Sequence, residues 1–256
     1  MSIHIFNTFT CNARWPSRLK TGLVCTLVET DRGLVLVDTG PGLEDYAHPH
    51  AMMRIFKAMF ELRFDPQEAA INQVRRLGFK PEDVRHIVLT HMHFDHCGGL
   101  PDFPRAAVHV HRREFEAFTG KHKSRWTEMA YIPRHLAHQP EFVLYDKPDG
   151  KWFDFEAIRL PFAPEMWLVP LFGHARGHCG VAIRTGDGWF FNAADAGAVY
   201  NNETPAWLIR LVLGPHDATL RAFMKTHPEV EVVNSHMMPE FFDEENYLAN
   251  LWQPGA

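Results

Sequence analysis

The six residues at positions 91–96 constrain the fold of this chain more than any other segment, because they read His-Met-His-Phe-Asp-His. The apolar run at 86–90 leads directly into them and predicts a short buried strand. His91 and His93 project to the same side if the backbone between them is extended. Zinc accepts imidazole and carboxylate ligands, and a catalytic ion keeps one position open for water. Four such groups exceed the needs of one such site, so the segment predicts two metal ions that share one loop.

The apolar pattern before this segment predicts a hairpin followed by helices. The runs at 23–28 and 34–37 are apolar strands joined by a turn at 31–33, and the glycines and proline at 40–42 end the second strand. Apolar residues then recur at helical spacing, which predicts an amphipathic helix over 51–64. That helix could cover a sheet, act as a substrate-facing lid or form a dimer surface.

A second helix is predicted from Asp65 to Gly78, with Pro66 at its first position and Glu68 three residues past its cap. Further apolar runs bounded by turn residues predict strands at 106–110, 152–160, 167–172, 181–185, 189–192 and 230–234. A last helix is predicted at 216–226. Strands in two series, each followed by helices and without a Gly/Ser-rich linker, predict two sheets packed face to face with helices outside.

Composition narrows the classes of partner and compartment. A chain of 256 residues with 46% hydrophobic content can bury a large core. A net charge of -5 does not favour nucleic acid or anionic lipid, so we expect a small-molecule substrate. The first residues do not read as a signal peptide and no run is long and apolar enough to span a bilayer, so a cytoplasmic protein is expected. The four cysteines lack CxxC spacing and indicate neither a disulfide framework nor a cysteine zinc site.

The segment from His91 to Gly99 resembles the HxHxDH signature of the metallo-β-lactamase-fold hydrolases. The other motifs of that family have similar counterparts here, in the family's order: Leu36 to Gly40, Gly173-His174, Asp195 and Ser235-His236. The resemblance implies an α/β fold of the αββα four-layer sandwich type, in which two mixed sheets carry helices on their outer faces. It implies a single domain over 1–256 with a helical insertion around 44–64.

The resemblance also implies how two divalent ions would be held, with zinc as the expected metal and iron or manganese as alternatives. One ion would be bound by His91, His93 and His174, and the other by Asp95, His96 and His236. Asp195 would bridge them. Two divalent ions against two carboxylates leave about two positive charges, enough to stabilise a bridging hydroxide near pH 7 as the nucleophile.

Two residues are candidates for catalytic roles beyond metal binding. Asp95 could carry a proton during the reaction. Tyr200 lies five residues after Asp195 and could donate to an oxyanion, although a loop tyrosine also commonly serves packing.

Other polar residues near the motifs have structural interpretations beside their functional ones. The resemblance favours His174 over His178 as the ligand, which leaves His178 to orient its neighbours, and it gives Asp38 a similar hydrogen-bonding role. Cys97 and Cys179 are expected to be buried and inert. His109 and His111 are expected to lie in the core or in solvent. His48 and His50 are expected to lie on a loop.

Within the family, the stretches at 75–83 and 107–111 look closest to the N-acyl-homoserine lactonases, which implies hydrolysis of an ester or lactone. Ala198 stands where those lactonases carry a tyrosine. The alternatives are phosphotriester or glutathione-thioester hydrolysis on the same site, or an iron-dependent sulfur dioxygenase that needs a single metal. A β-lactamase is disfavoured because Asp195 stands where Cys or Ser would be expected. No nucleic acid or membrane partner is expected, and a homodimer is left open.

Overall fold

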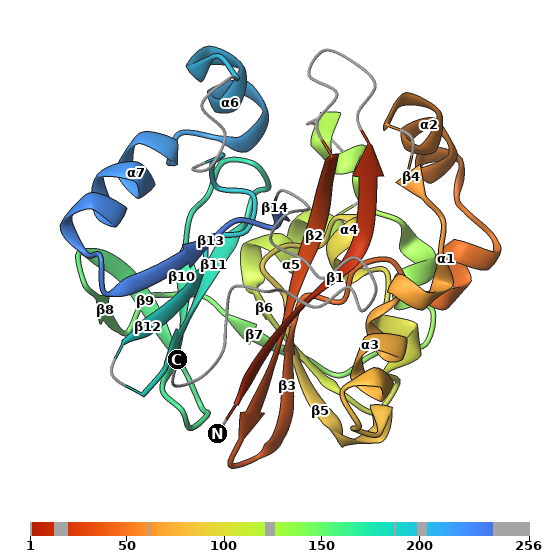
Figure 1. Ribbon diagram of the computed structural model, residues 1–256, viewed down its shortest axis with the longest axis horizontal. Helices are drawn as coiled ribbons and strands as arrows, with labels where there is room; N and C mark the ends of the chain where they lie inside the picture. The colour runs from red at the N-terminus through yellow and green to blue at the C-terminus, as the bar shows by residue number, and fades with distance from the viewer. Residues whose placement is uncertain are drawn as a thin grey trace.

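The structure is a computed structural model that describes residues 2–12, 20–60, 62–120, 126–186, 188–198 and 204–237. Two β-sheets pack face to face, and helices cover the outer face of each (Figure 1). Helices α6 and α7 flank the smaller sheet, and α1 to α3 lie on the far side of the larger one. The predicted αββα sandwich with two mixed sheets is therefore confirmed.

The larger sheet has the order β4-β1-β2-β3-β5-β6-β7, and β14 pairs with β2 beside this path. Its strands are β1 (Ile3–Asn12), β2 (Lys20–Thr30), β3 (Gly33–Val37), β4 (Leu62–Arg63), β5 (Val84–Val88), β6 (Ala107–His111), β7 (Phe142–Tyr145) and β14 (His236–Met237). Strands β3, β5, β6 and β7 are parallel to one another, whereas β1, β2 and β3 are antiparallel neighbours.

The smaller sheet has the order β13-β12-β11-β10-β9-β8. Its strands are β8 (Gly150–Trp152), β9 (Phe155–Leu160), β10 (Met166–Pro170), β11 (Cys179–Arg184), β12 (Trp189–Asn192) and β13 (Val230–Val233). All of its neighbours are antiparallel except β12 and β13, which are parallel.

The helices connect the strands of both sheets. They are α1 (Leu43–Ala47), α2 (Ala51–Phe60), α3 (Ala70–Arg76), α4 (Phe94–Cys97), α5 (Arg112–Thr119), α6 (Ala206–Leu213) and α7 (Asp217–Thr226). Short 3-10 turns are η1 (Pro66–Glu68), η2 (Pro81–Asp83), η3 (Leu100–Asp102), η4 (Trp126–Ala130) and η5 (Pro133–Leu136). Among the described residues, no helix combines the length and the apolar character needed to cross a membrane.

The residues of strand β3 from Leu34 to Val37 are all apolar, because both faces of the strand are buried. Leu34 and Leu36 pack in the core under the outer helices, whereas Val35 and Val37 pack in the core between the two sheets. Successive side chains of a strand point to opposite faces, so a strand covered on both faces must be apolar at every position. The strand delivers Asp38 directly to the end of the sandwich.

Several local predictions differ from the observed elements. The strand predicted at 152–160 is a hairpin of β8 and β9, because Phe153 adopts a positive φ of 50° and turns the chain. Asp65 caps the turn η1 by accepting a hydrogen bond from Gln67 N. Glu68 does not return to that cap but accepts hydrogen bonds from the backbone and hydroxyl of Thr10.

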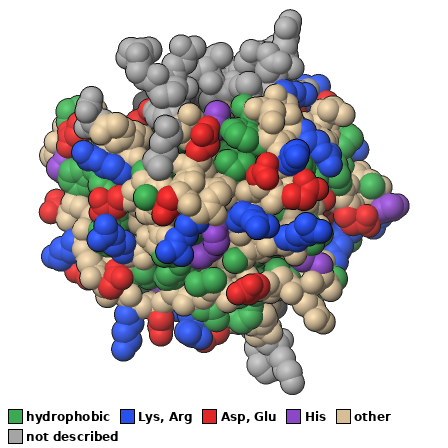
Figure 2. Space-filling view, turned by 90° about the horizontal axis from the view of Figure 1, so that it is seen from below, with side chains coloured by type: hydrophobic (Ala, Val, Ile, Leu, Met, Phe, Trp, Pro, Cys, Tyr) green, Lys and Arg blue, Asp and Glu red, His purple; other side chains and the backbone are tan. Residues whose placement is uncertain are grey.

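Figure 2 shows one face of the molecule, on which basic and acidic side chains are interspersed. The formal charge of -5 is thus not concentrated on that face as a field of one sign.

Helix α2, which falls in the predicted insertion, packs onto the histidine segment. Met53 is fully buried and forms a small cluster with Phe94 and Ile132. Phe94 lies between His93 and Asp95, so the helix rests on the residue that separates two of the predicted ligands. The side chains of Phe56, Met59 and Phe60 lie outside the described part of this helix.

Replacement of Met53 by alanine tests this contact. Truncation of a buried methionine leaves a cavity, and we expect Met53→Ala to lower the free energy of unfolding by about 2–5 kcal/mol. Ile55, on the same helix, is 52% exposed. Its replacement by alanine is the matched control and should change stability by less than about 0.5 kcal/mol. Urea titration measures both, and equal losses in the two variants would contradict the contact.

Candidate metal centre

The predicted ligands come from strand ends of both sheets. The loop after β5 carries His91 and leads into α4, the loop between β10 and β11 carries His174, and Asp195 follows β12. His236 lies on β14, whose pairing with β2 places it opposite Leu23. Figure 1 shows β14 crossing from the smaller sheet toward β2 near α4. Segments that are far apart in sequence therefore meet at one end of the sandwich.

Three histidine nitrogens converge on one side of the site. His93 Nδ1 lies 3.1 Å from His91 Nε2 and 3.1 Å from His174 Nε2. Tetrahedral zinc with Zn–N bonds of about 2.0–2.1 Å places neighbouring ligand nitrogens about 3.3–3.4 Å apart. The spacing of the three nitrogens is thus close to that of ligands around one ion.

Asp195 lies between this group and a second one. Its Oδ2 atom is close to four imidazole Nε2 atoms: His174 at 3.3 Å, His96 at 3.5 Å, His236 at 3.6 Å and His91 at 3.9 Å. On the far side, Asp95 Oδ2 lies 3.7 Å from His236 Nε2 and 3.8 Å from His96 Nε2. All seven predicted metal residues are therefore brought together, in groups whose ligand atoms could each hold an ion.

The hydrogen bonds around Asp38 determine which ring nitrogens face the centre. Asp38 is fully buried and accepts hydrogen bonds from Thr90 N at 2.9 Å, Thr90 Oγ1 at 2.7 Å and His96 Nδ1 at 2.9 Å. Because the Thr90 hydroxyl proton is given to Asp38, its oxygen accepts from His91 Nδ1 at 3.1 Å. Both histidines thus donate through Nδ1, which directs Nε2 of each ring at the centre. The hydrogen-bonding role expected of Asp38 is therefore seen at Thr90 and His96.

His174 and His178 have different roles in the loop between β10 and β11. His174 Nδ1 donates to Val212 O at the end of α6, at 2.8 Å, so its Nε2 lone pair faces the centre. His178 Nδ1 donates to Leu171 O at 3.1 Å, and its Nε2 accepts from Asp195 N at 3.0 Å. Burial lowers the pKa of His178 to about 3, which keeps the ring neutral and able to accept. Both ring nitrogens of His178 are occupied, and it holds the Asp195 backbone.

The electrostatics of the centre favour cation binding. Burial and the neighbouring histidines hold the pKa values of His91 and His93 well below the usual range, so both are neutral. Burial alone would raise the pKa of Asp195, but His236 and His96 hold it well below its ordinary value. His96 Nε2 and Asp195 Oδ1 are buried without a hydrogen-bond partner. Against the effect of burial, Asp195 and Asp95 raise the pKa values of His96 and His236, so a cation on that side would take the place of protons, whereas neutral His91 and His93 can bind one directly. This donor set, with ionised Asp195, fits a divalent cation on each side of that carboxylate.

The candidate catalytic residue Tyr200 lies outside the described residues. The other polar residues singled out in the sequence are not among the groups that could hold an ion. Cys97 and Cys179 are fully buried, and burial raises the pKa of both thiols well above the usual value. His109 forms two hydrogen bonds with neighbouring side chains. Its Nδ1 lies 2.8 Å from Tyr145 Oη, and its Nε2 lies 3.1 Å from His86 Nδ1. His48 is exposed beside Glu44.

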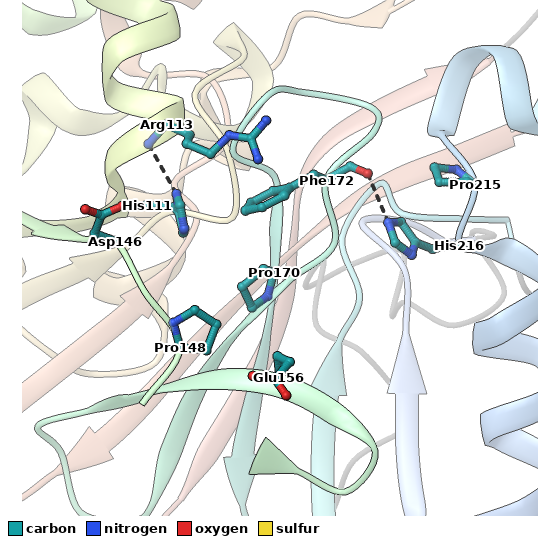
Figure 3. A pocket seen from close by; sticks show the side chains of 9 residues that line it. All are labelled: His111, Arg113, Asp146, Pro148, Glu156, Pro170, Phe172, Pro215 and His216. Carbon is teal, nitrogen blue, oxygen red and sulfur yellow. Dashed lines mark hydrogen bonds between the residues drawn. The ribbon is translucent and has the colours of Figure 1, made fainter. Parts of the chain in front are cut away.

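His111 borders a surface groove of about 490 Å³, shown in Figure 3. Phe172, two residues before His174, lies in its middle, under the guanidinium of Arg113 at 4.2 Å from the ring centre. On the other side, His216 Nε2 donates to Phe172 O at 3.0 Å. None of the seven predicted metal residues is among the described residues that line this groove.

Sequence reasoning did not identify Glu114, Tyr131 or Val212, which support the ligand loops. Glu114 bonds to Met92 N, Gly177 N and Tyr131 Oη, and Val212 O holds His174. The one available signal was Glu114, a carboxylate on a segment that is otherwise apolar on its buried side. A backbone carbonyl such as that of Val212 leaves no mark in the sequence.

Comparison with known proteins agrees with this geometry. A family model described as the Metallo-beta-lactamase superfamily matches residues 22–236. A probable metallo-hydrolase of Mycobacterium tuberculosis is 39% identical over 202 residues, which cover 77% of this chain and 62% of that protein. An N-acyl homoserine lactonase of Bacillus cereus is 26% identical over 163 residues, which cover 63% of this chain and 58% of that protein. The chain thus spans about three fifths of the length of the curated relatives it matches.

Solved structures show the same fold. An N-acyl homoserine lactone hydrolase, determined with the product N-hexanoyl-L-homoserine at its catalytic metal centre, aligns with a TM-score of 0.67. Its sequence is 20% identical, and the alignment covers 91% of this chain and 92% of that one. A probable metal-dependent hydrolase from Staphylococcus aureus aligns with a TM-score of 0.63 at 16% identity, over 92% and 88% of the two chains.

Replacement of Gly214 by alanine tests the support of His174 by α6. Gly214 has φ of 92° and ψ of -167°, and a Cβ there would lie 2.9 Å from Gly173 Cα. The strain costs about 1–3 kcal/mol. The shift should also pull Val212 O from His174 and weaken zinc binding by about 10–100-fold.

The control is Gly78→Ala, because Gly78 has φ of 88° but a Cβ there would meet no neighbouring atom within 4 Å. It should lose stability without losing zinc affinity. Differential scanning calorimetry and competition against a chelator measure the two quantities. Equal zinc affinity in the two variants would argue against the support.

Proposed function

This chain belongs to the metallo-beta-lactamase superfamily, and from that premise we propose that it is a metal-dependent hydrolase that holds two divalent cations. Zinc is the proposed metal, because imidazole-rich sites with carboxylate suit it, and iron or manganese would accept the same ligands. His91, His93 and His174 would hold one ion. Asp95, His96 and His236 would hold the other, and Asp195 would contact both.

The position of Asp195 carries this proposal. Its Oδ2 atom lies 3.3–3.9 Å from four imidazole nitrogens that belong to both groups. A single ion with an open position takes three protein ligands, so one ion would leave buried lone pairs of the other group without a partner. Two ions use all seven side chains.

The bound ions would acidify a coordinated water and polarise the acyl oxygen of the substrate. The chain itself supplies orientation and a proton acceptor. Asp38 and Thr90 fix the tautomers of His91 and His96, which keeps Nε2 of each ring directed at the centre. Asp95 is only partly buried, with 17% of its side chain exposed, so it can exchange a proton with substrate or solvent.

The proposed substrate is an ester or lactone of a small molecule. The similarity to the lactonase of Bacillus cereus, at 26% identity, supports this class. The fold shared with a lactone hydrolase that binds N-hexanoyl-L-homoserine is consistent with it. We further propose that the protein is a single domain that acts in the cytoplasm, without a nucleic acid or membrane partner. Self-association is open to measurement by sedimentation.

Metal content tests the two-ion proposal. Elemental analysis of the purified protein should give about two divalent ions per chain, because the seven ligands form two sites joined by Asp195. Dialysis against a chelator should abolish turnover, and zinc should restore it. One ion per chain, with full hydrolytic activity, would overturn the two-ion assignment, whereas a single iron ion without hydrolytic turnover would favour the dioxygenase alternative.

Turnover of a substrate panel tests the reaction. We expect hydrolysis of lactones or esters, tested beside thioesters, β-lactams and phosphotriesters. Asp95→Asn should lower kcat by about 100-fold or more, because the amide cannot take up a proton. Asp154→Asn is the control, since Asp154 is exposed. Metal content of Asp95→Asn must be measured in parallel, because Asp95 is also a proposed ligand. Turnover of nucleic acid alone would refute the proposed substrate class.

A further inference from the structure

Glu114 is a fully buried carboxylate that has no place among the seven metal residues. It lies in the first turn of α5, and three donors surround it. Glu114 Oε1 accepts from Met92 N at 3.0 Å and from Tyr131 Oη at 2.9 Å, and Oε2 accepts from Gly177 N at 2.8 Å. A buried carboxylate is tolerated only when it is paired in this way. Charge-assisted hydrogen bonds of this kind are roughly twice as strong as neutral ones.

The two backbone donors belong to the two loops that carry the three-histidine group. Met92 lies between His91 and His93, in the loop after β5 of the larger sheet. Gly177 follows His174, in the loop before β11 of the smaller sheet. A Cβ on Gly177 would lie 2.3 Å from Glu114 N, so this loop rests directly on the start of α5. One side chain therefore connects ligand loops from opposite sheets.

Tyr131 links the same carboxylate to a ligand ring. Its hydroxyl donates to Glu114, and its ring centre lies 5.3 Å from that of His93. The tyrosine is buried, so its hydroxyl needs the acceptor that Glu114 provides. The ring of His93 is thereby bordered by a side chain whose position depends on Glu114.

The three-histidine group needs such support before a cation arrives. The Nε2 atoms of His91 and His174 are both acceptors, and His93 Nδ1 lies 3.1 Å from each. It can donate a proton to only one of them, so the other contact is unfavourable until a cation lies between the two nitrogens. The loops must therefore be held by bonds outside the ligand rings. Partners that orient ligands in this way commonly change metal affinity about 10–100-fold when they are removed.

We propose that Glu114 is a positioning residue that joins the two ligand loops and assembles the site of His91, His93 and His174 before metal binds. This inference rests on the proposed function, because it takes those three histidines as ligands. The hydrogen bonds of Glu114 go to Met92, Tyr131 and Gly177 and not to the three histidine rings, so it acts through the loop backbones.

Glu114→Gln tests the proposal with little change in shape. The glutamine amide offers one acceptor oxygen and an NH2 donor, so it cannot accept from three donors, and one loop amide loses its partner. Glu68→Gln is the matched control. Glu68 is equally buried and accepts a backbone amide and a hydroxyl, both from Thr10, but it lies beside β1 and not between the ligand loops.

Zinc affinity of the two variants should differ. Competition with a chromophoric chelator should show about 10–100-fold weaker binding of the first ion in Glu114→Gln, and wild-type affinity in Glu68→Gln. The rise in melting temperature on zinc addition should shrink in Glu114→Gln alone, because that variant binds zinc less tightly. A role in stability alone would lower the melting temperatures of the metal-free and zinc-loaded protein equally. Wild-type zinc affinity in Glu114→Gln would overturn the proposal.

Amide exchange in the wild-type protein tests the proposal even if Glu114→Gln does not fold. The Met92 and Gly177 amides should exchange slowly in chelator-treated protein, because Glu114 protects both without metal. Fast exchange that slows only when zinc is added would overturn the proposal. The two failures are distinguishable: wild-type protein that binds no zinc refutes the proposed function, whereas zinc binding unaffected by Glu114→Gln refutes only the role of Glu114.

Discussion

The fold depends on placing a buried carboxylate, Asp195, among four imidazoles. An ionised carboxylate without water is costly, and a single neutral partner does not offset that cost. Here the partners His91, His96, His174 and His236 arrive from three separate segments. The site therefore requires both sheets to be in place, and the free energy of binding cations would be part of the free energy that stabilises the fold.

Hydrogen bonds to the backbone, and to ring nitrogens that face away from the centre, hold these segments in position. Asp38 fixes the loop after β5, His178 holds the Asp195 backbone, and Val212 fixes His174 through a carbonyl at the end of α6. Glu114 then joins the loops of the two sheets. Each contact uses a buried polar group whose partner is backbone or a ligand nitrogen. The site is thus organised by groups that are not among the seven predicted metal residues, and such groups fix the orientation of side chains that bind metal.

Much of the fold could be predicted where local pattern and tertiary environment agree. The run at 34–37 is apolar throughout because both of its faces are covered, and it forms β3 within one residue of the predicted start. The prediction of a single strand at 152–160 was wrong, because the chain turns at Phe153, whose positive φ is not expected for an aromatic residue. Strand β1 was not predicted, because Asn7 and Thr8 interrupt its apolar pattern, and both form hydrogen bonds with Leu23 of the neighbouring strand β2 that the sequence does not show.

The sequence by itself determined which side chains are available to the site, because six residues from His91 to His96 already hold four groups with metal-binding chemistry. It also determined, through the buried strand before them, that these groups lie at a strand end. Only the tertiary structure decided which nitrogens face one another, that the partner of His178 is the Asp195 backbone, and that Glu114 connects the loops. The reason is physical: ligand identity is a property of single residues, whereas distance and tautomer depend on hydrogen bonds between segments that are remote in the chain.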